Sequence, residues 1–229
     1  MTLASMAATL PAYLMPEPER NALSHSPPAA ADDAGESSDQ ESVRLMLRVK
    51  EGDVKAFEQL VELHQNAVVG TCARMLNNID DAHDIAQQVF IRVWRSAPRY
   101  EVTAKFTTWL FTITRNLVFN ETRRRSRRKE VSMEQENEDD PPKYFTDHST
   151  PGADHITQQT ELEQALDTAI AALPEKQRIA VIMRRHQDLP YEDICAVLKM
   201  SLPAVKSLLF RARTELRKHL AAHLGEEVE

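Results

Sequence analysis

Residues 191–217 read YEDICAVLKMSLPAVKSLLFRARTELR, and this stretch decides the fold because it holds two short helical patterns joined by a tight turn. In the second pattern, apolar residues recur at steps of three and four and form one stripe: Val205, Leu209, Ala212, Leu216 and Leu220. At about 100° per residue, the residues that fall roughly 80–140° from Val205 are Lys206, Phe210, Arg213 and Arg217, with Ser207 and Arg211 just beyond. An apolar face beside a cationic face predicts a helix-turn-helix whose second helix enters the major groove of DNA.

The rest of the composition favours an all-α protein. The chain has 229 residues with only 5 glycines, and alternating strand patterns are absent. Its two cysteines, Cys72 and Cys195, stand far apart inside apolar helical stretches, so we expect buried thiols rather than a disulfide or a metal site. The sequence shows no nucleophile–base pair, ligand-spaced cluster or phosphate loop, so we expect no enzyme, cofactor or small-molecule substrate.

Charge is segregated along the chain. The formal net charge of −7 hides two basic blocks, over 41–129 and 164–221, separated by an acidic segment over 130–163. This pattern suggests two nucleic-acid-facing modules with a linker between them. No apolar run approaches the ~18–20 residues of a membrane span, so we expect a cytoplasmic protein without a membrane partner.

Helical patterns and composition divide the chain into five parts. The first basic block contains four helical patterns: about 42–50, 53–76 with Asp53 as N-cap, a third opened by Asp80 and Asp81, and a fourth starting near Phe106. The second block has a helix ending at Leu173, a helix after Pro174, and the helix-turn-helix. We expect a disordered extension over 1–40, helical domains over 41–129 and 160–221, a flexible acidic linker over 130–159, and an acidic tail over 222–229.

Two long segments together resemble a known family. Residues 81–128 (DAHDIAQQVF…RRRSRR) and 172–220 (ALPEKQRIAV…LRKHL) are similar to regions 2 and 4 of an extracytoplasmic-function (ECF) sigma factor. The resemblance covers roughly 41–128 and 160–220, in the right order and with a linker between. It implies a protein that binds core RNA polymerase, reads duplex DNA at the −35 element with its second domain, and melts and reads the −10 non-template strand with its first.

The helix from Asp81 to Trp94 carries the polymerase-docking role in the family. Carried over, the docking residues are Asp84, Gln87, Gln88 and Phe90. Amides and a carboxylate can pair with cations across an interface while an aromatic residue anchors it. An ordinary amphipathic helix with its polar face in water would show the same pattern. Gln88 stands where the family usually has a glutamate, which weakens one expected ion pair.

The −10 role falls on the loop 96–105 and the helix after it. The resemblance assigns promoter contacts to Phe106, Thr107, Thr108, Trp109, Asn116, Asn120, Arg123, Arg124 and Arg125. Aromatic faces stack on unpaired bases, and a pocket for an everted base makes strand opening selective. Phe106 and Trp109 also lie on the helix's own apolar seam, which favours a core role instead. The run 123–129 (RRRSRRK) fits either a grip on duplex phosphates or a solvated basic tail.

The −35 role falls on the second helix of the helix-turn-helix. The resemblance assigns contacts with bases or backbone to Lys206, Ser207, Phe210 and Arg211, and we expect Arg213 and Arg217 to hold phosphates. Two residues depart from the family pattern: Leu208 replaces an arginine, so one phosphate contact is missing, and Lys199 replaces the turn glycine.

Three points stay open from the sequence. The acidic run 134–140 (EQENEDD) fits either a mimic of RNA in the polymerase exit path or a solubilising tether. An anti-sigma factor is a typical partner in the family, although no residue here identifies one. The alternative function is a stand-alone helix-turn-helix regulator, but it leaves the docking-like helix and the basic run unexplained.

Overall fold

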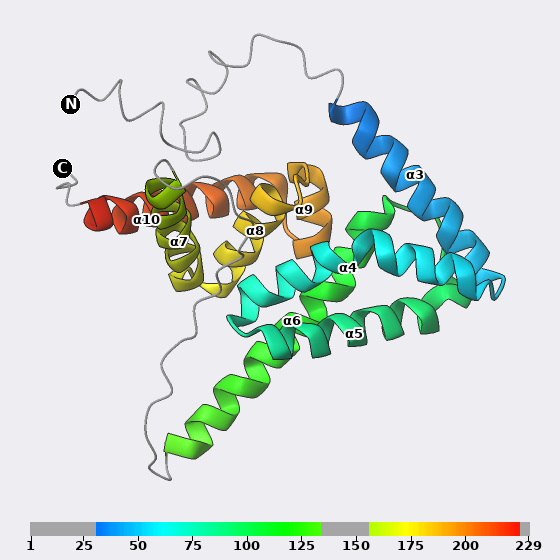
Figure 1. The fold of residues 1–229 in the computed structure, drawn as a ribbon, viewed down its shortest axis with the longest axis horizontal. Helices are drawn as coiled ribbons and strands as arrows, with labels where there is room; N and C mark the ends of the chain where they lie inside the picture. The colour runs from blue at the N-terminus through cyan, green and yellow to red at the C-terminus, as the bar shows by residue number, and fades with distance from the viewer. Residues whose placement is uncertain (1–30, 134–155, 225–229) are drawn as a thin grey trace.

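The computed structural model describes residues 31–133 and 156–224, and every element within these ranges is a helix (Figure 1). The all-α prediction is therefore confirmed for the described residues. The elements are α3 (Ala31–Lys50), α4 (Val54–Leu76), α5 (Ile79–Ser96), the short 3₁₀ helix η2 (Ala97–Arg99), α6 (Phe106–Met133), α7 (Ile156–Ala172), α8 (Glu175–His186), α9 (Tyr191–Leu198) and α10 (Leu202–Leu224).

The first lobe consists of α3 to α6, and its helix ends are set by short polar side chains. Asp53 caps α4 by accepting a hydrogen bond from the Ala56 N–H at 3.1 Å, as its position in the sequence predicts. At the other end of α4, Asn77 adopts a left-handed conformation with φ 51°, and Asn78 then caps α5 by accepting from the Asp81 N–H. This two-residue turn brings α4 and α5 side by side as an antiparallel pair, on which α3 and α6 pack.

Several boundaries differ from the sequence prediction. Helix α3 begins at Ala31, inside the extension expected to be disordered, and residues near its middle, Asp39 and Ser42, contact the rest of the lobe. Helix α6 continues to Met133, past the expected start of the linker, and α7 begins at Ile156. The acidic run 134–140, residues 1–30 and the end of the tail lie outside the described residues.

The second lobe consists of α7 to α10, with α9 and α10 forming the predicted helix-turn-helix. Pro174 sits at the N-cap of α8 rather than inside its first turn, where its missing N–H is equally harmless. The predicted stripe of α10 is confirmed as core, because Val205, Leu209, Ala212, Leu216 and Leu220 are all buried. Cys72 is also buried, which raises the pKa of its thiol to about 12, and both cysteines are free.

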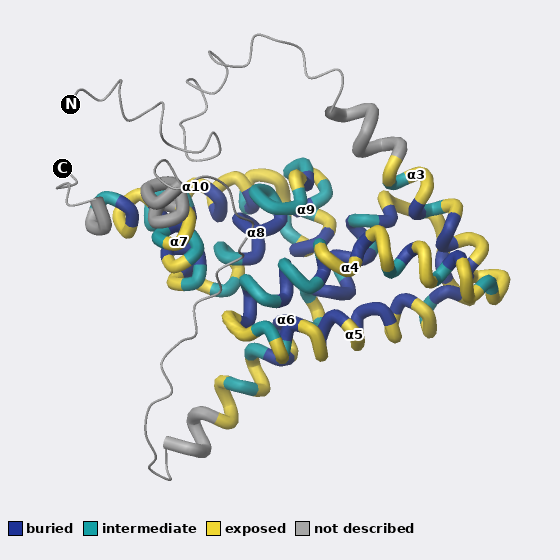
Figure 2. Tube along the Cα trace, viewed as in Figure 1, coloured by how far each residue is buried: buried dark blue, intermediate teal, exposed yellow. Residues whose placement is uncertain are grey.

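The two lobes pack directly on each other, with α8 against α4 and α9 against α6 (Figure 2). Arg178 of α8 donates a hydrogen bond to the Met75 carbonyl oxygen of α4 at 2.9 Å. Gln187, which follows α8, donates from Nε2 to Thr71 Oγ1 at 3.2 Å and to the Ala67 carbonyl oxygen at 3.4 Å. These bonds satisfy polar groups that the contact removes from water, so the second lobe is held against the first by both packing and hydrogen bonds.

Charged groups also meet at this contact. Lys105 Nζ, just before α6, lies 3.3 Å from Asp193 Oδ2 on α9. Burial, together with the nearby cations Arg74 and Arg185, lowers the pKa of His186 to about 3. His186 is therefore neutral in the packed arrangement at ordinary pH.

Candidate nucleic-acid and polymerase interface

The cationic face of α10 is open to solvent. Lys206, Ser207 and Arg211 are exposed, and Phe210 has 67% of its surface accessible although it is a large apolar residue. An exposed phenylalanine between cations is suited to contact a thymine methyl while its neighbours reach guanine or phosphate oxygens. The structure therefore brings these four sequence-predicted residues together on one accessible face.

The other two predicted residues of α10 lie towards the middle and end of the helix. Arg213 is half-buried and donates from Nε to the Leu209 carbonyl oxygen at 3.3 Å, while Arg217 is exposed. Leu208 is 6% exposed and belongs to the core, which agrees with the interpretation that this position makes no phosphate contact.

The turn between α9 and α10 places a lysine where the family pattern has a glycine, and the backbone of that lysine is strained. Lys199 caps α9 in the left-handed region, with φ 54° and ψ 48°. Its N–H contacts the Ala196 carbonyl oxygen at 3.4 Å, and the Met200 N–H donates to the Cys195 carbonyl oxygen at 3.0 Å. A non-glycine residue in this region costs about 1–2 kcal/mol, and the buried residues on both sides of the turn hold it there.

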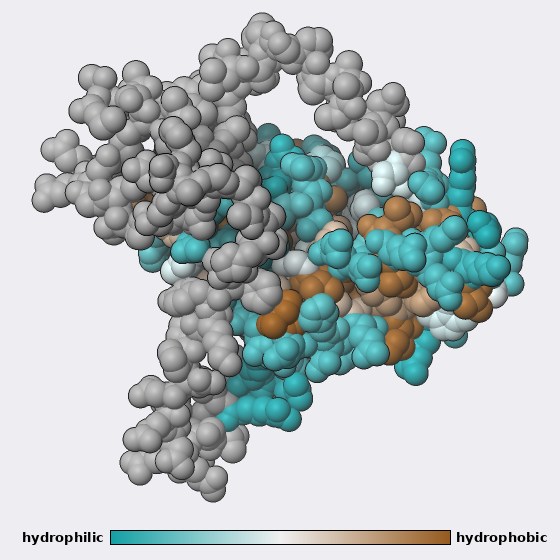
Figure 3. All heavy atoms as spheres, viewed as in Figure 1, coloured by the Kyte–Doolittle hydropathy of each residue, from teal (hydrophilic) through white to brown (hydrophobic). Residues whose placement is uncertain are grey.

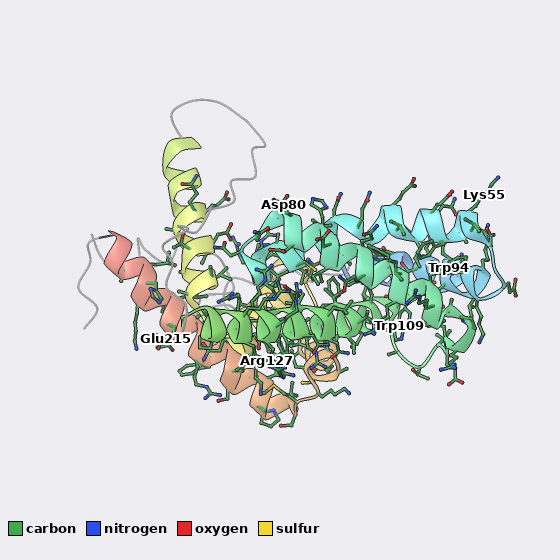
Figure 4. All side chains as sticks on the ribbon, turned by 90° about the horizontal axis from the view of Figure 1, so that it is seen from below. Lys55, Asp80, Trp94, Trp109, Arg127 and Glu215 are labelled. Atoms are coloured by element: carbon green, nitrogen blue, oxygen red, sulfur yellow. The ribbon has the colours of Figure 1, made fainter. Side chains whose placement is uncertain are left out.

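The start of α6, where Figure 4 labels Trp109, divides the predicted −10 residues between core and surface. Phe106 is fully buried, with its ring centroid 5.1 Å from that of His64 and 5.7 Å from that of Trp109. Thr108 is also buried, whereas Thr107 and Trp109 keep part of their surface accessible. In this arrangement Phe106 acts as a core residue, and Thr107 and Trp109 are the residues at the start of α6 that a base could reach.

The basic end of α6 is partly tied down within the protein. Glu121 pairs with Arg124 at 2.7 Å and with Arg125 at 3.1 Å, and the Arg124 hydrogen bond is the main reason that its pKa lies below the ordinary value. Arg125 also pairs with Asp81 of α5 and donates to the Leu76 carbonyl oxygen at 3.3 Å. Arg125 therefore holds α6 against the α4–α5 turn.

The remaining predicted −10 residues of α6 face solvent. Asn116, Asn120, Arg123 and Arg124 are exposed. The exposed asparagines lie one turn apart on α6, and Arg123 continues their line towards the basic end. These side chains can reach a phosphate backbone that passes along the helix.

The predicted docking residues lie along α5. Asp84, Gln87 and Gln88 are exposed, whereas Phe90 is only 8% exposed and lies in the floor of a groove between α4 and α5. Figure 3 shows apolar atoms at the surface over these two helices. The groove has a volume of about 610 Å³, and the residues that line it are Val54, Phe57, Val61, Gln65, Val69, His83, Ala86, Gln87, Phe90, Ile91 and Trp94.

Sequence reasoning missed three exposed apolar residues of this groove. Val54 is 56% exposed, Ile91 43% and Trp94 38%, and the Trp94 ring packs edge-on against Phe57 at 5.0 Å. Ile91 lies four residues after Gln87, and Trp94 lies three residues after Ile91. The two apolar residues therefore share one side of α5, beside its core stripe. That shared side was the available signal, since exposed apolar groups that gather in a groove mark an interaction site.

Two other kinds of site do not occur among the described residues. Within 31–133 and 156–224, no three His, Cys, Asp or Glu side chains gather closely enough to hold a metal ion. No helix in that part of the chain is long and apolar enough to cross a membrane.

Family models match both lobes. The model described as Sigma-70 region 2 matches residues 60–128, and the model described as Sigma-70, region 4 matches residues 163–216. The RNA polymerase sigma-H factor of Pseudomonas aeruginosa is 30% identical over 190 residues, which span 82% of this chain and 97% of that protein. The ECF RNA polymerase sigma-E factor of Haemophilus influenzae is 33% identical over 172 residues, which span 74% of this chain and 89% of that protein. The chain belongs to the ECF sigma factors of the sigma-70 family.

Solved structures agree with this assignment of the sigma factor. The sigma factor RpoE of Bartonella quintana, solved in complex with the anti-sigma factor NepR, is 25% identical with a TM-score of 0.60, over 73% of this chain and 98% of that one. CnrH, solved with the cytosolic domain of CnrY, shares the fold at 20% identity with a TM-score of 0.57, over 80% of this chain and 98% of that one. The first lobe of this ECF sigma factor is region 2 and the second is region 4, and the protein acts in promoter-specific initiation of transcription.

Proposed function

We propose that this sigma factor reads the −35 element with the exposed face of α10. The observation that carries the proposal is the exposure of Lys206, Phe210 and Arg211 beside a fully buried stripe on the same helix. A helix of this kind can enter the major groove without disturbing its own core. The neighbouring buried face packs on the core of region 4 and holds α10 rigidly, as base reading requires.

Region 2 supplies the other two contacts in this proposal. The groove between α4 and α5, with Asp84, Gln87 and Gln88 at its edge, binds core RNA polymerase in the cytoplasm. Thr107, Trp109 and the loop before α6 engage the unpaired −10 strand, and the exposed cations after Asn120 hold duplex phosphates. The polymerase performs the chemistry of RNA synthesis, while this protein recruits the polymerase to the promoter and positions the promoter DNA.

The packed arrangement of the two lobes must open for this function. Elements centred at −35 and −10 lie about 25 base pairs apart, or roughly 85 Å along duplex DNA. In the structure the loop before α6 touches α9 through Lys105 and Asp193. One molecule in this state cannot reach both elements, so we infer that binding to polymerase separates the lobes. An anti-sigma factor that favours the packed state would act as an inhibitor, and the likeness to an RpoE bound to NepR supports such a partner.

The experiment is in vitro transcription with the double variant Lys206→Ala, Arg211→Ala. We expect loss of promoter-specific transcription with unchanged binding to core polymerase. The double variant Arg44→Ala, Lys176→Ala removes the same charge from exposed positions on α3 and α8, and it should transcribe normally. Transcription that survives the Lys206 and Arg211 changes would refute the assignment of the face. Tight, specific binding of promoter DNA by the isolated chain at physiological salt would instead favour a stand-alone regulator.

A further inference from the structure

Helix α6 begins without a capping side chain of its own. Lys105 precedes it, and a lysine side chain cannot accept hydrogen bonds from the first free N–H groups of a helix. The cap comes from α3, because Asp39 accepts from the Phe106 N–H at 3.1 Å, from the Thr107 N–H at 3.1 Å and from the Thr107 hydroxyl at 3.0 Å. A carboxylate at this place also faces the positive end of the helix dipole.

The loop before α6 is tied to the same helix at its other end. Lys50 Nζ donates to the Tyr100 carbonyl oxygen at 2.8 Å. Asp39 and Lys50 are eleven residues apart on α3, a separation of about 16 Å along the helix axis. One rigid helix therefore fixes both ends of the segment 100–106.

Buried contacts hold α3 itself in place. Ser42 is fully buried; its hydroxyl donates to the Ser38 carbonyl oxygen at 2.9 Å and lies 2.8 Å from His64 Nε2 on α4. Since the single serine proton is used on Ser38, the His64 Nε2–H must be the donor to Ser42. The His64 ring in turn packs on Phe106. The position of Asp39 is thus set by the core of region 2.

Between the two fixed ends, the loop is open to solvent. Residues 101–105 are all exposed, and Val102 has 55% of its surface accessible. The charges of Asp39 and Lys50 are used on backbone groups, so their role in this arrangement is to fix the shape of the loop. A loop with anchored ends and an accessible middle is suited to receive an everted base, because little further ordering is needed on binding.

We propose that Asp39 is a positioning residue for −10 recognition: with Lys50, it holds the loop 101–105 and the first turn of α6 in the shape that engages the unpaired non-template strand. The proposal rests on the proposed function, in which this loop meets the −10 element. Asp39 touches no base itself and acts through the backbone of Phe106 and Thr107.

The test uses holoenzyme assembled from core polymerase and the full chain. The probe is a single-stranded non-template oligonucleotide copied from the −10 region of a promoter mapped upstream of the chain's own gene, beside the same oligonucleotide with that region scrambled. We expect Asp39→Ala to reduce the preference for the matched strand about tenfold, the equivalent of one charge-assisted hydrogen bond. Core affinity and duplex −35 binding should stay unchanged. Asp39→Asn, which keeps one acceptor oxygen, should fall between.

Matched variants separate positioning from loss of folding. Lys50→Met keeps the aliphatic stem and should lower discrimination in the same direction. Glu41→Ala and Arg44→Met change exposed charges on α3 and should have no effect. The proposal is overturned if Asp39→Ala keeps full discrimination, or if every Asp39 and Lys50 variant weakens core binding and both oligonucleotides equally. If wild-type holoenzyme shows no preference for the matched over the scrambled oligonucleotide, the proposed function of the loop is overturned as well. If only the Asp39 and Lys50 variants lose that preference, the proposed function of the loop stands.

Discussion

Gln187→Ala should shift this sigma factor from the packed state towards the open state. The side chain makes two neutral hydrogen bonds across the lobe contact, to Thr71 Oγ1 and to the Ala67 carbonyl oxygen. Each such bond contributes about 0.5–1.5 kcal/mol, and both are long, at 3.2 and 3.4 Å, so we place the combined loss in the lower part of the range, at about 1–2 kcal/mol. That change alters the ratio of packed to open molecules by a factor of about 5 to 30. No bond within either lobe is removed.

Energy transfer between two dyes measures this equilibrium. Cysteines introduced as Glu58→Cys on α4 and Lys218→Cys on α10 are both exposed, and they place one dye on each lobe. Cys195→Ser removes the partly accessible native thiol, and Cys72 is buried. We expect Gln187→Ala to lower energy transfer in the free chain and to leave it unchanged in holoenzyme, where both proteins are already open.

Promoter affinity gives a second readout. The apparent dissociation constant of a protein scales inversely with the fraction that is competent to bind. If wild type is mostly packed, Gln187→Ala should tighten binding of the free chain to a promoter that carries both elements by up to the same factor of about 5 to 30. Gln59→Ala, an exposed glutamine on α4, is the control. Energy transfer and affinity that match wild type would show that this contact does not hold the lobes together.

Three further outcomes follow from single sites. Ile91→Asp places a charge in the apolar groove and should weaken core polymerase binding at least about tenfold in a competition assay, since burying an unpaired charge costs several kcal/mol; the exposed, polar Gln59→Asp change should not. Arg125→Ala removes the tie to Asp81 and Glu121 and should lower the thermal midpoint by several degrees, for a loss of about 1–2 kcal/mol, whereas Arg127→Ala should leave it unchanged. Because the pKa of His186 falls to about 3 in the packed state, the unfolded chain binds more protons between pH 6.5 and about 3, so stability should fall as pH drops through that window. Urea unfolding at pH 7 and pH 5 tests this, and His186→Gln should reduce the difference; an unchanged difference would contradict the burial of this ring.

Local patterns in the sequence were enough to place most helices. The stripe from Val205 to Leu220 and the cap at Asp53 depend on residues within a few positions of one another, and the structure confirms both. The exposed cationic face of α10 follows from the same geometry, because charged residues on a side of the helix that the buried stripe leaves uncovered stay in contact with water.

Contacts between distant residues could not be read from the sequence. The cap of α6 comes from Asp39, 67 residues upstream of Phe106, and no local pattern links them. The core role of Phe106 could not be separated from base stacking, because both uses require an aromatic residue on the same face of α6. The tie made by Arg125 was hidden in a run of cations that looks uniform until Asp81 and Glu121 are placed beside it.

The most direct test of the central claim is run-off transcription with purified core polymerase on the DNA upstream of the chain's own gene. We expect a discrete transcript only when the protein is added, with the protein bound to core polymerase in the same reaction. No transcript from any matched promoter, together with no association between the protein and core polymerase, would contradict the account.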